Sequence, residues 1–494
     1  MVLQRHFWSL LKRRDYLLLN NNLEVSVLNL SEVKKNSEMR IDSDFFLKEY
    51  LQLDSILEKA IIIEDIVQLA DVTSNGSFKA VSDILNDTYP KDVPYIRSGN
   101  VGNTFLNTNE LTKISRVAHG RLVASQTKLH DVMMARKGKI GGASIITENE
   151  VGFNCNENVV KLTLLSDDFN PFYFTAFFNS KYGLKQVERF STGNVQPWLS
   201  MFQIRKLKIP KLSKKFQVEI EKIIKEALSY KISSDENYNC AEKMLLDRLE
   251  FSLEDEKFVG KQLAIKKFKE IQTFNRFDAE YYQPFYDYIE NSIKNNYYGK
   301  SIIESGIEII DSSFIPEQKK VYKYVELSNI GSYGEITGFT ESIGADLPSR
   351  ARRILKKDDV IVSSIEGSLE SCAIVTEEFD GALCSTGFYV LRSKIISPYF
   401  LLALFKSKMM QLLLKKRCSG TILTSINKAD FMTLLIPEIG KEQEEHISKM
   451  FKQTLELRAK SNLILEYCKR AIEIAIEEGE EKACAYINEN LYMP

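Results

Sequence analysis

The chain has few of the residues from which structural metal sites and disulfide frameworks are built. It contains seven cysteines, an odd number, and only four histidines among 494 residues. The cysteines are scattered, and no two have the Cys-x-x-Cys spacing that is typical of a zinc site. We therefore expect free thiols in a reducing cytoplasm, with neither a disulfide framework nor a bound metal.

Long apolar runs are also missing. No uncharged apolar stretch is long enough to span a membrane. Charged residues, among them Arg5, Lys12 and Arg13, interrupt the N-terminal segment, so it lacks the apolar centre of a signal peptide. We predict a cytoplasmic protein that does not contact a membrane.

An excess of charge of one sign is the third thing the chain lacks. Its 66 basic and 67 acidic residues give a formal net charge of −1. Any contact with nucleic acid must therefore come from local basic surface. The length predicts two or three domains, and the composition is that of a globular protein with sizeable cores.

The chain repeats itself over a long period, which indicates its architecture. Five blocks recur in the same order at an offset of 227 to 229 residues, and a sixth, Arg40 to Phe46, is echoed by Arg276 to Tyr282. The five pairs are 95–101 with 324–330, 131–134 with 359–362, 171–174 with 398–401, 191–193 with 418–420, and 207–210 with 434–437. We interpret this as a tandem duplication covering roughly 40–250 and 276–475.

Each copy is predicted to contain a buried strand, then a helix with proline in its first turn, then a short strand that ends at proline. The expected ranges are 131–135, 171–181 and 204–209 in the first copy and 359–363, 398–408 and 431–436 in the second. Asn170 and Ser397 are the expected N-caps of the two helices.

A long helix is predicted at the end of each copy, because apolar residues recur there at three- and four-residue steps. These stripes are Phe216, Ile220, Ile223, Ala227, Tyr230, Tyr238, Ala241, Leu245 and Leu249, and then Ile447, Phe451, Thr454, Leu465, Cys468, Ile472 and Ala475. A helix of roughly 35 residues is about 50 Å long, which suits a spacer between domains. Mutual antiparallel pairing is the simplest way to bury both stripes, although residues 233–237 could kink or break the first helix.

Together these blocks resemble the specificity (S) subunits of type I restriction–modification systems. The shared features are an Arg-x-Asp-x-x-aromatic-aromatic opening, an Asp-Val strand with a glycine turn, a Gly-x-x-x-x-x-Leu/Ile loop, a strand ending in Ile-Pro, and a Gln-x-x-Ile helix start. In the first copy they are residues 40–46, 131–142, 193–199, 207–210 and 217–220, and in the second 276–282, 359–367, 420–426, 434–437 and 443–447. The second glycine turn departs from the first, because 366–370 is acidic where 136–139 is basic.

The resemblance implies an α+β protein with two tandem globular α/β target-recognition domains, each followed by a long helix, the two helices pairing as an antiparallel coiled coil. The segments expected are a lead-in at 1–39, a first recognition domain at 40–212, a central long helix at 213–252, a connector at 253–275, a second recognition domain at 276–438, a C-terminal long helix at 439–478 and a tail at 479–494.

The resemblance also implies the function. Each copy would read one half of a bipartite target in double-stranded DNA, and the helices would recruit two modification (M) subunits. Those subunits would methylate adenine with S-adenosylmethionine, and restriction (R) subunits with ATP and magnesium could join them. The same chain could instead serve a complex that only methylates. No cofactor is expected on this chain.

Basic residues on turns are the expected phosphate contacts. The first set is Arg136, Lys137 and Lys139 on the glycine turn, and the second is Arg350, Arg352 and Arg353 ahead of the 359–363 strand, with an exposed helix face as the alternative. A denser run at 205–215 could serve DNA or a modification subunit.

Arginine to guanine, and asparagine or glutamine to adenine, are the favoured base contacts. The candidates in apparent loops are Arg97, Asn100, Asn194 and Gln196 in the first copy and Tyr333, Thr421 and Thr424 in the second. Ordinary turn chemistry is the alternative for each of them.

Catalysis by this chain is disfavoured. Residues 170–173, Asn-Pro-Phe-Tyr, superficially resemble the base-holding loop of an adenine methyltransferase, but their repeat partner at 397–400 explains both as helix starts. No glycine-rich cofactor loop, nuclease-like acidic cluster or P-loop accompanies them.

Overall fold

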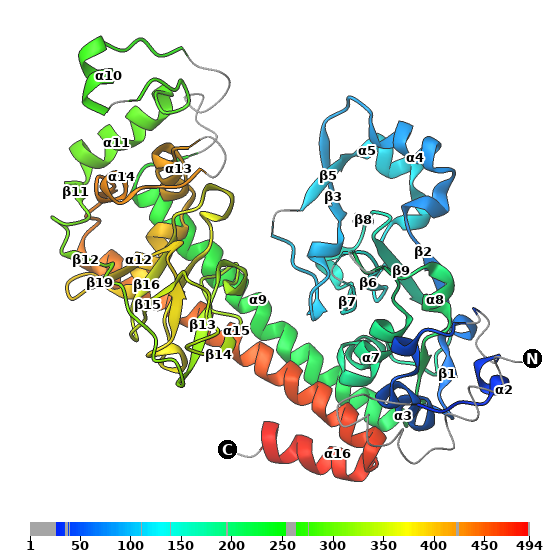
Figure 1. Ribbon diagram of the computed structural model, residues 1–494. Coiled ribbons are helices and arrows are strands. Elements are labelled where there is room, and N and C mark those ends of the chain that lie inside the picture. Colours follow the sequence, from blue (N-terminus) through cyan, green and yellow to red (C-terminus); the bar gives the residue numbers. More distant parts are fainter. Residues whose placement is uncertain are drawn as a thin grey trace, which may run out of the picture. The chain divides into compact units, whose positions relative to one another are not determined.

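The computed structural model describes residues 26–492 except 35–37, 39, 110, 139, 194–195, 253–262, 275 and 421–423. The chain divides into two compact units (Figure 1). Unit 1 comprises Met1–Leu228 and Asn462–Pro494, and unit 2 comprises Ser229–Ser461. Each unit therefore holds one copy of the repeat together with part of each long helix.

Unit 1 is built on one five-stranded and one three-stranded sheet. Its strands are β1 (Ile61–Ile62), β2 (Val67–Ala70), β3 (Lys91–Ile96), β4 (Thr104–Phe105), β5 (Thr112–Ser115), β6 (Val132–Ala135), β7 (Ala143–Ile145), β8 (Asn154–Cys155), β9 (Val159–Leu164) and β10 (Lys208–Ile209). The sheet orders are β2-β9-β6-β7-β4 and β5-β3-β8, and β1 pairs with β10. The central strand β6 is buried along its whole length, as its apolar run predicts.

The helices of unit 1 pack around these sheets. They are α2 (Leu30–Val33), α3 (Lys48–Ile56), α4 (Phe78–Leu85), α5 (Arg116–Arg121), α6 (Pro171–Asn179), α7 (Lys181–Phe190), α8 (Met201–Arg205) and α16 (Glu480–Ile487). α6 is buried along almost its whole length, so it forms part of the core.

Unit 2 repeats this plan. Its strands are β11 (Lys300–Ser301), β12 (Ile307–Ile310), β13 (Val321–Val325), β14 (Thr340–Ile343), β15 (Ala351–Ile354), β16 (Val360–Ser363), β17 (Cys372–Ile374), β18 (Leu383–Ser385), β19 (Phe388–Ser393) and β20 (Leu435–Ile436). The orders β12-β19-β16-β17 and β14-β13-β18-β15, with β11 paired to β20, match unit 1 strand for strand except for β4 and β15. The helices are α10 (Phe268–Phe274), α11 (Pro284–Asn296), α12 (Pro398–Lys406), α13 (Lys408–Arg417) and α14 (Lys428–Met432). The predicted duplication is confirmed.

The two predicted long helices are α9 (Lys214–Arg248) and α15 (Lys441–Glu477). Every residue of the second predicted stripe is buried, and so is the first stripe apart from half-buried Tyr230 and Tyr238. Within unit 2 the helices run antiparallel (Figure 1). Lys460 lies 4.2 Å from the Tyr230 ring, and the Tyr238 and Phe451 rings are 5.2 Å apart.

The possible kink at 233–237 is wrong, because α9 is continuous there. Ser234 is fully buried, and its hydroxyl donates to the Thr454 carbonyl at 2.9 Å. Asp235 accepts from Arg458 at 2.8 Å. The polar residues that suggested a break therefore have partners on α15.

Two short-strand predictions are partly wrong. Residues 201–205 form α8, which Ser200 and Gln203 cap reciprocally, and only Lys208–Ile209 are extended. In the second copy Asn427 caps α14, and β20 is equally short. Local capping thus competes successfully with the apolar pattern.

The predicted proline-led helices begin where expected. Pro171 and Pro398 occupy their first turns, and the Asn170 side chain caps α6, whereas Ser397 holds the cap position without a side-chain bond. Both helices end earlier than predicted, because extended Ser180 or Ser407 separates each from the next helix.

Candidate nucleic-acid interface

The β6–β7 hairpin carries the basic glycine turn of the first copy. Gly138 has φ +81°, in the left-handed region that favours glycine. The turn pairs with the second glycine loop of the same copy. The Leu199 amide donates to the Arg136 carbonyl at 2.8 Å, and the Gly138 amide donates to the Pro197 carbonyl at 3.3 Å. Two segments about 60 residues apart in sequence are thus joined.

A third segment reaches the same place. A Cβ atom placed on Gly138 would lie 3.7 Å from Gln196 Nε2 and 3.9 Å from Ser98 Oγ. We call residues 97–100, 136–142 and 192–198 the first loop cluster. Arg97, Lys137 and Gln196 are exposed on it, whereas Lys139 and Asn194 lie outside the described residues.

The second copy builds an equivalent cluster. The Ile426 amide donates to the Ser364 carbonyl at 2.8 Å, and the Glu366 amide donates to the Thr424 carbonyl at 3.1 Å. A Cβ atom on Gly387 would lie 3.8 Å from Ile365 and 3.9 Å from Leu327. We call residues 326–329, 364–368 and 424–426 the second loop cluster. Thr421 lies outside the described residues.

Arg136 is held inside the fold. Its guanidinium pairs with the fully buried Asp71 at 2.9 Å and donates to the Glu157 carbonyl at 2.8 Å and the Leu199 carbonyl at 3.3 Å. These contacts tie the base of the turn to the sheet. Arg136 therefore fixes the turn, while its neighbour Lys137 projects into solvent.

Asn100 also serves its own loop. Its Oδ1 accepts from the Arg97 amide at 2.9 Å, and its Nδ2 donates to the Asn107 carbonyl at 3.1 Å. This is the turn chemistry that the sequence left as the alternative. Asn100 thereby sets the position at which Arg97 leaves the loop.

Tyr333 is buried, at 7% exposure, and is not accessible to DNA. Its ring lies 3.5 Å from the Arg458 guanidinium carbon and packs edge-on against Tyr238 at 5.0 Å. Tyr333 thus anchors the second copy to the helix pair. The loop pattern that suggested a base contact could not reveal this packing.

The three arginines ahead of β16 lie on or beside strand β15, so the alternative of an exposed helix face is wrong. Arg350 is exposed. Arg353 donates to the Ile310 carbonyl at 3.2 Å and Arg352 to the Ser349 carbonyl at 2.8 Å. Of the three, Arg350 is the best placed to reach a ligand.

The Arg-x-Asp opening of each copy packs against a later helix, and we call this contact the clasp. Arg40 pairs with Asp42 at 2.8 Å, and its guanidinium lies 4.6 Å from the Phe45 ring. Arg189 of α7 lies 4.4 Å from the same ring. The second copy has the same arrangement, with Arg276 at 4.6 Å and Lys416 at 5.0 Å from Tyr281.

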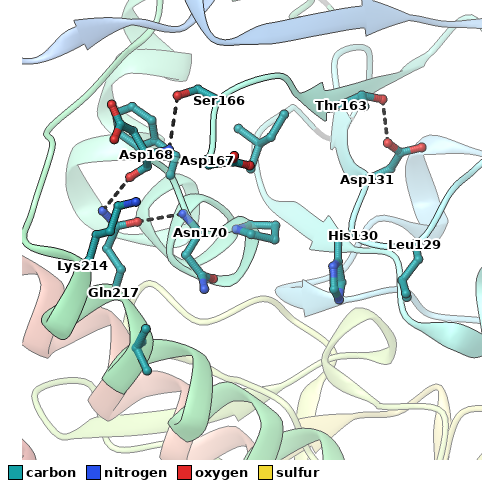
Figure 2. Close-up of a pocket in the computed structure, with 14 residues that line it drawn as sticks. Leu129, His130, Asp131, Thr163, Ser166, Asp167, Asp168, Asn170, Lys214 and Gln217 are labelled. Atoms are coloured by element: carbon teal, nitrogen blue, oxygen red, sulfur yellow. Dashed lines mark hydrogen bonds between the residues drawn. The ribbon is translucent and has the colours of Figure 1, made fainter.

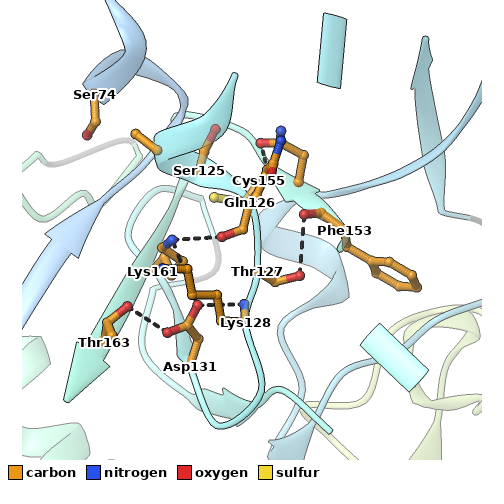
Figure 3. A network of polar contacts seen from close by, with 12 residues as sticks. Ser74, Ser125, Gln126, Thr127, Lys128, Asp131, Phe153, Cys155, Lys161 and Thr163 are labelled. Atoms are coloured by element: carbon orange, nitrogen blue, oxygen red, sulfur yellow. Dashed lines mark hydrogen bonds and ion pairs between the residues drawn. The ribbon is translucent and has the colours of Figure 1, made fainter. Parts of the chain in front are cut away.

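The Asp-Val motif is equally structural. Asp131 accepts from the Lys128 amide at 2.8 Å and from Thr163 Oγ1 at 2.6 Å, and it lies 3.8 Å from the buried Lys161 ammonium (Figure 3). Asp359 instead receives two bonds from Arg392, at 2.7 and 2.8 Å. Each aspartate fixes the start of the strand that leads to the glycine turn.

A cavity of about 380 Å³ lies beside the N-terminus of α6 (Figure 2). Asp131, Asp167 and Asp168 are among its lining residues, and a hydrogen bond from Lys211 lowers the pKa of Asp168. Carboxylates do not attract DNA phosphates. We therefore leave this cavity out of the interface.

Asn170, at the edge of that cavity, belongs to a helix cap. Its backbone amide donates to Gln217 at 2.7 Å, and its side-chain amide donates to Glu221 at 2.5 Å. In the second copy the Ser397 amide donates to Glu444 at 3.0 Å. This repeated bond joins the helix start to α9 or α15 and explains the Asn-Pro-Phe-Tyr sequence without methyltransferase chemistry.

Three of the six cations in the dense basic run at 205–215 form ion pairs. Arg205 lies 3.6 Å from Glu64, Lys206 lies 3.5 Å from Glu38, and Lys211 lies 2.6 Å from Asp168.

Among the residues that the structure describes, no cluster of His, Cys, Asp or Glu could hold a metal ion. Within the same ranges, no helix is long and apolar enough to cross a bilayer.

Comparison with known families gives a match to part of the chain. Residues 63–238 match the type I restriction modification DNA specificity domain. No curated protein matches the sequence.

Similar solved structures include the S subunit of a type I restriction-modification system from M. genitalium, with 13% identity, 86% of this chain and 95% of that chain covered, and a TM-score of 0.36. The HsdS subunit from Thermoanaerobacter tengcongensis has 12% identity, coverage of 86% and 95%, and a TM-score of 0.26. A chain from work on complex assembly and conformational transition of the type I R-M system has 12% identity, coverage of 85% and 97%, and a TM-score of 0.26.

The matched segment covers most of the first copy and most of α9. The second copy has the same sheet order, the same joined loops and the same clasp. Both halves of the chain are therefore forms of one domain. Residues 63–238 are thus similar to the DNA specificity domain of type I restriction–modification systems, and the second copy repeats the fold of that segment.

Proposed function

We propose that each copy reads one half of a bipartite DNA target, with its loop cluster in the major groove. One observation carries this proposal: the same three-segment cluster is built twice, on equivalent sheets, by joined loops whose backbone bonds match pair for pair. Loops held by a rigid scaffold can differ in sequence without changing the fold. Such a design suits two modules that read different base sequences.

The proposed contacts divide by role. We assign Lys137 and Arg350 to phosphates, and Arg97, Gln196 and Thr424 to base edges. Lys139, Asn194 and Thr421 remain proposals from the sequence. The positioning residues are Arg136, Asn100, Arg352, Arg353 and Tyr333.

We further propose that α9 and α15 recruit two modification subunits, which carry S-adenosylmethionine and methylate adenine. Two equivalent copies, each joined to the helix pair in the same way, can present the same surface twice. Restriction subunits using ATP and magnesium would add cleavage. A system without them would use this chain unchanged.

A domain exchange tests the proposal. Residues 40–212 are replaced by the matching segment of another family member, and the methylated sites in cells are mapped by sequencing. We expect one half of the recognised site to change and the other to stay. Exchange of residues 276–438 should do the reverse. A change in both halves from either exchange would refute independent reading.

A further inference from the structure

Arg97 of the first loop cluster and Glu326 of the second occupy the same structural position. The Arg97 amide donates to Asn100 Oδ1 at 2.9 Å, and the Glu326 amide donates to Asn329 Oδ1 at 2.8 Å. The backbone carbonyls of Arg97 and Glu326 then accept from the backbone amides of Asn100 and Asn329, at 2.9 and 3.0 Å. The two loops are superimposable turns, so their first side chains leave the backbone at the same point with opposite charges.

The surroundings of the two side chains also correspond. Ser98, which follows Arg97, lies near Gly138 of the first glycine turn, and Leu327, which follows Glu326, lies near Gly387, as does Ile365 of the second turn. Arg97 lies two positions after Tyr95, and Glu326 lies two positions after Tyr324. The charge of each acts on the pKa of its tyrosine. Burial raises the pKa of Tyr95 and of Tyr324, and Arg97 opposes this rise in Tyr95 whereas Glu326 adds to it in Tyr324. The opposite charges therefore act at equivalent places.

The charge reversal extends to the glycine turns. The matching backbone bonds align Arg136 with Ser364, Lys137 with Ile365 and Gly138 with Glu366. Thr424 donates a hydrogen bond to the Glu366 carboxylate, which directs that carboxylate along the loop cluster. The first cluster therefore exposes cations, and the second presents two carboxylates.

Positive charge is still supplied beside the second cluster, but from another element. Arg350 precedes β15, a strand that the first copy lacks, and its charge acts on Tyr324. An exposed arginine that acts on the same tyrosine as Glu326 separates attraction to the DNA backbone from contact with bases. The carboxylates are then available to contact bases.

We propose that Arg97 reads a guanine and that Glu326 reads a cytosine at the matching position of the other half-site. A guanidinium donates to guanine O6 and N7 in the major groove, whereas a carboxylate accepts from the cytosine N4 amino group and is repelled by the guanine acceptors. The inference rests on the proposed function, because it assumes that the loop clusters face the major groove. It adds which base each copy selects.

The test uses the full chain with its modification subunits and a library of random-sequence duplexes. We expect Arg97→Ala to lose selection at one G·C pair in one half-site, by about tenfold or more, and Glu326→Ala to lose selection at one pair in the other half. Arg97→Glu and Glu326→Arg should reverse the orientation of the selected pair. Lys59→Ala and Glu341→Gln, on exposed residues outside the clusters, should leave both half-sites unchanged.

A base analogue tests the wild-type protein directly. Replacing guanine by 7-deazaguanine removes N7, so it should weaken binding at the pair read by Arg97 and should have no such effect on the Arg97→Ala variant. At the pair read by Glu326, the same replacement should leave binding unchanged. If 7-deazaguanine at both pairs leaves specific binding by the wild-type protein unchanged, this inference is overturned and the proposed function is not. Equal binding to all duplexes would overturn the proposed function as well.

Discussion

At the scale of single residues, two neighbouring cations have different roles. Arg136 pairs with fully buried Asp71, whereas Lys137 is exposed. Removing one partner of a buried pair leaves an uncompensated charge. We expect Arg136→Ala to lower the free energy of unfolding by roughly 3 kcal/mol, measured by urea denaturation. Exposed Arg121 provides the control, and a loss there as large as that for Arg136 would contradict this role.

Lys137→Ala should instead leave stability within about 0.5 kcal/mol and weaken DNA binding. Loss of one phosphate contact lowers the slope of log K against log salt by about 0.9. Titration of the complex with duplex DNA at several salt concentrations measures this slope. An unchanged slope would remove Lys137 from the interface.

Glu290 of α11 predicts a pH dependence. Burial alone would raise the pKa of Glu290, but Arg417 and Lys416 outweigh it and hold the pKa below its ordinary value of 4.5. A depressed carboxyl pKa stabilises the fold above the unfolded-state pKa, and this contribution is lost as the pH falls through the folded-state pKa. Glu290→Gln should therefore cost roughly 3 kcal/mol at pH 7. Denaturation at a series of pH values should show this difference shrinking below pH 4.5. A constant difference would contradict the ion-pair explanation.

At the scale of elements, the second copy is anchored to the helix pair through a ring. Tyr333 lies between Arg458 of α15 and Tyr238 of α9. We expect Tyr333→Ala to lower the free energy of unfolding by about 3 kcal/mol, as for other buried aromatic residues, and to leave the recognised DNA sequence unchanged. Ile315→Ala, at a side chain that is 78% exposed, is the control. An altered target sequence with normal stability would indicate that Tyr333 contacts DNA.

At the scale of the whole molecule, the proposed function is recognition of DNA without catalysis. We expect the purified chain to show no adenine methyltransferase activity, and to support activity once its modification subunits are added. Transfer of a labelled methyl group from S-adenosylmethionine to duplex DNA measures this. Activity from the chain alone would contradict the proposed function.

The sequence by itself determined the duplication, the two buried strands, the proline-led helices and the apolar stripes of α9 and α15. All of these depend on local periodicity and on a constant offset between copies, which are visible in one dimension. The sequence also predicted that the joined segments of each cluster are turns, because glycine marks turns; their contact with DNA stays a prediction.

Only the tertiary structure decided which of those loop residues face solvent. Arg136 and Tyr333 have the residue types of DNA contacts. Arg136 nevertheless pairs with a buried aspartate, and Tyr333 packs between two helices. The match between Arg97 and Glu326 likewise depends on backbone bonds that close each turn. The physical reason is that burial and pairing are set by residues distant in sequence, about which local pattern carries no information.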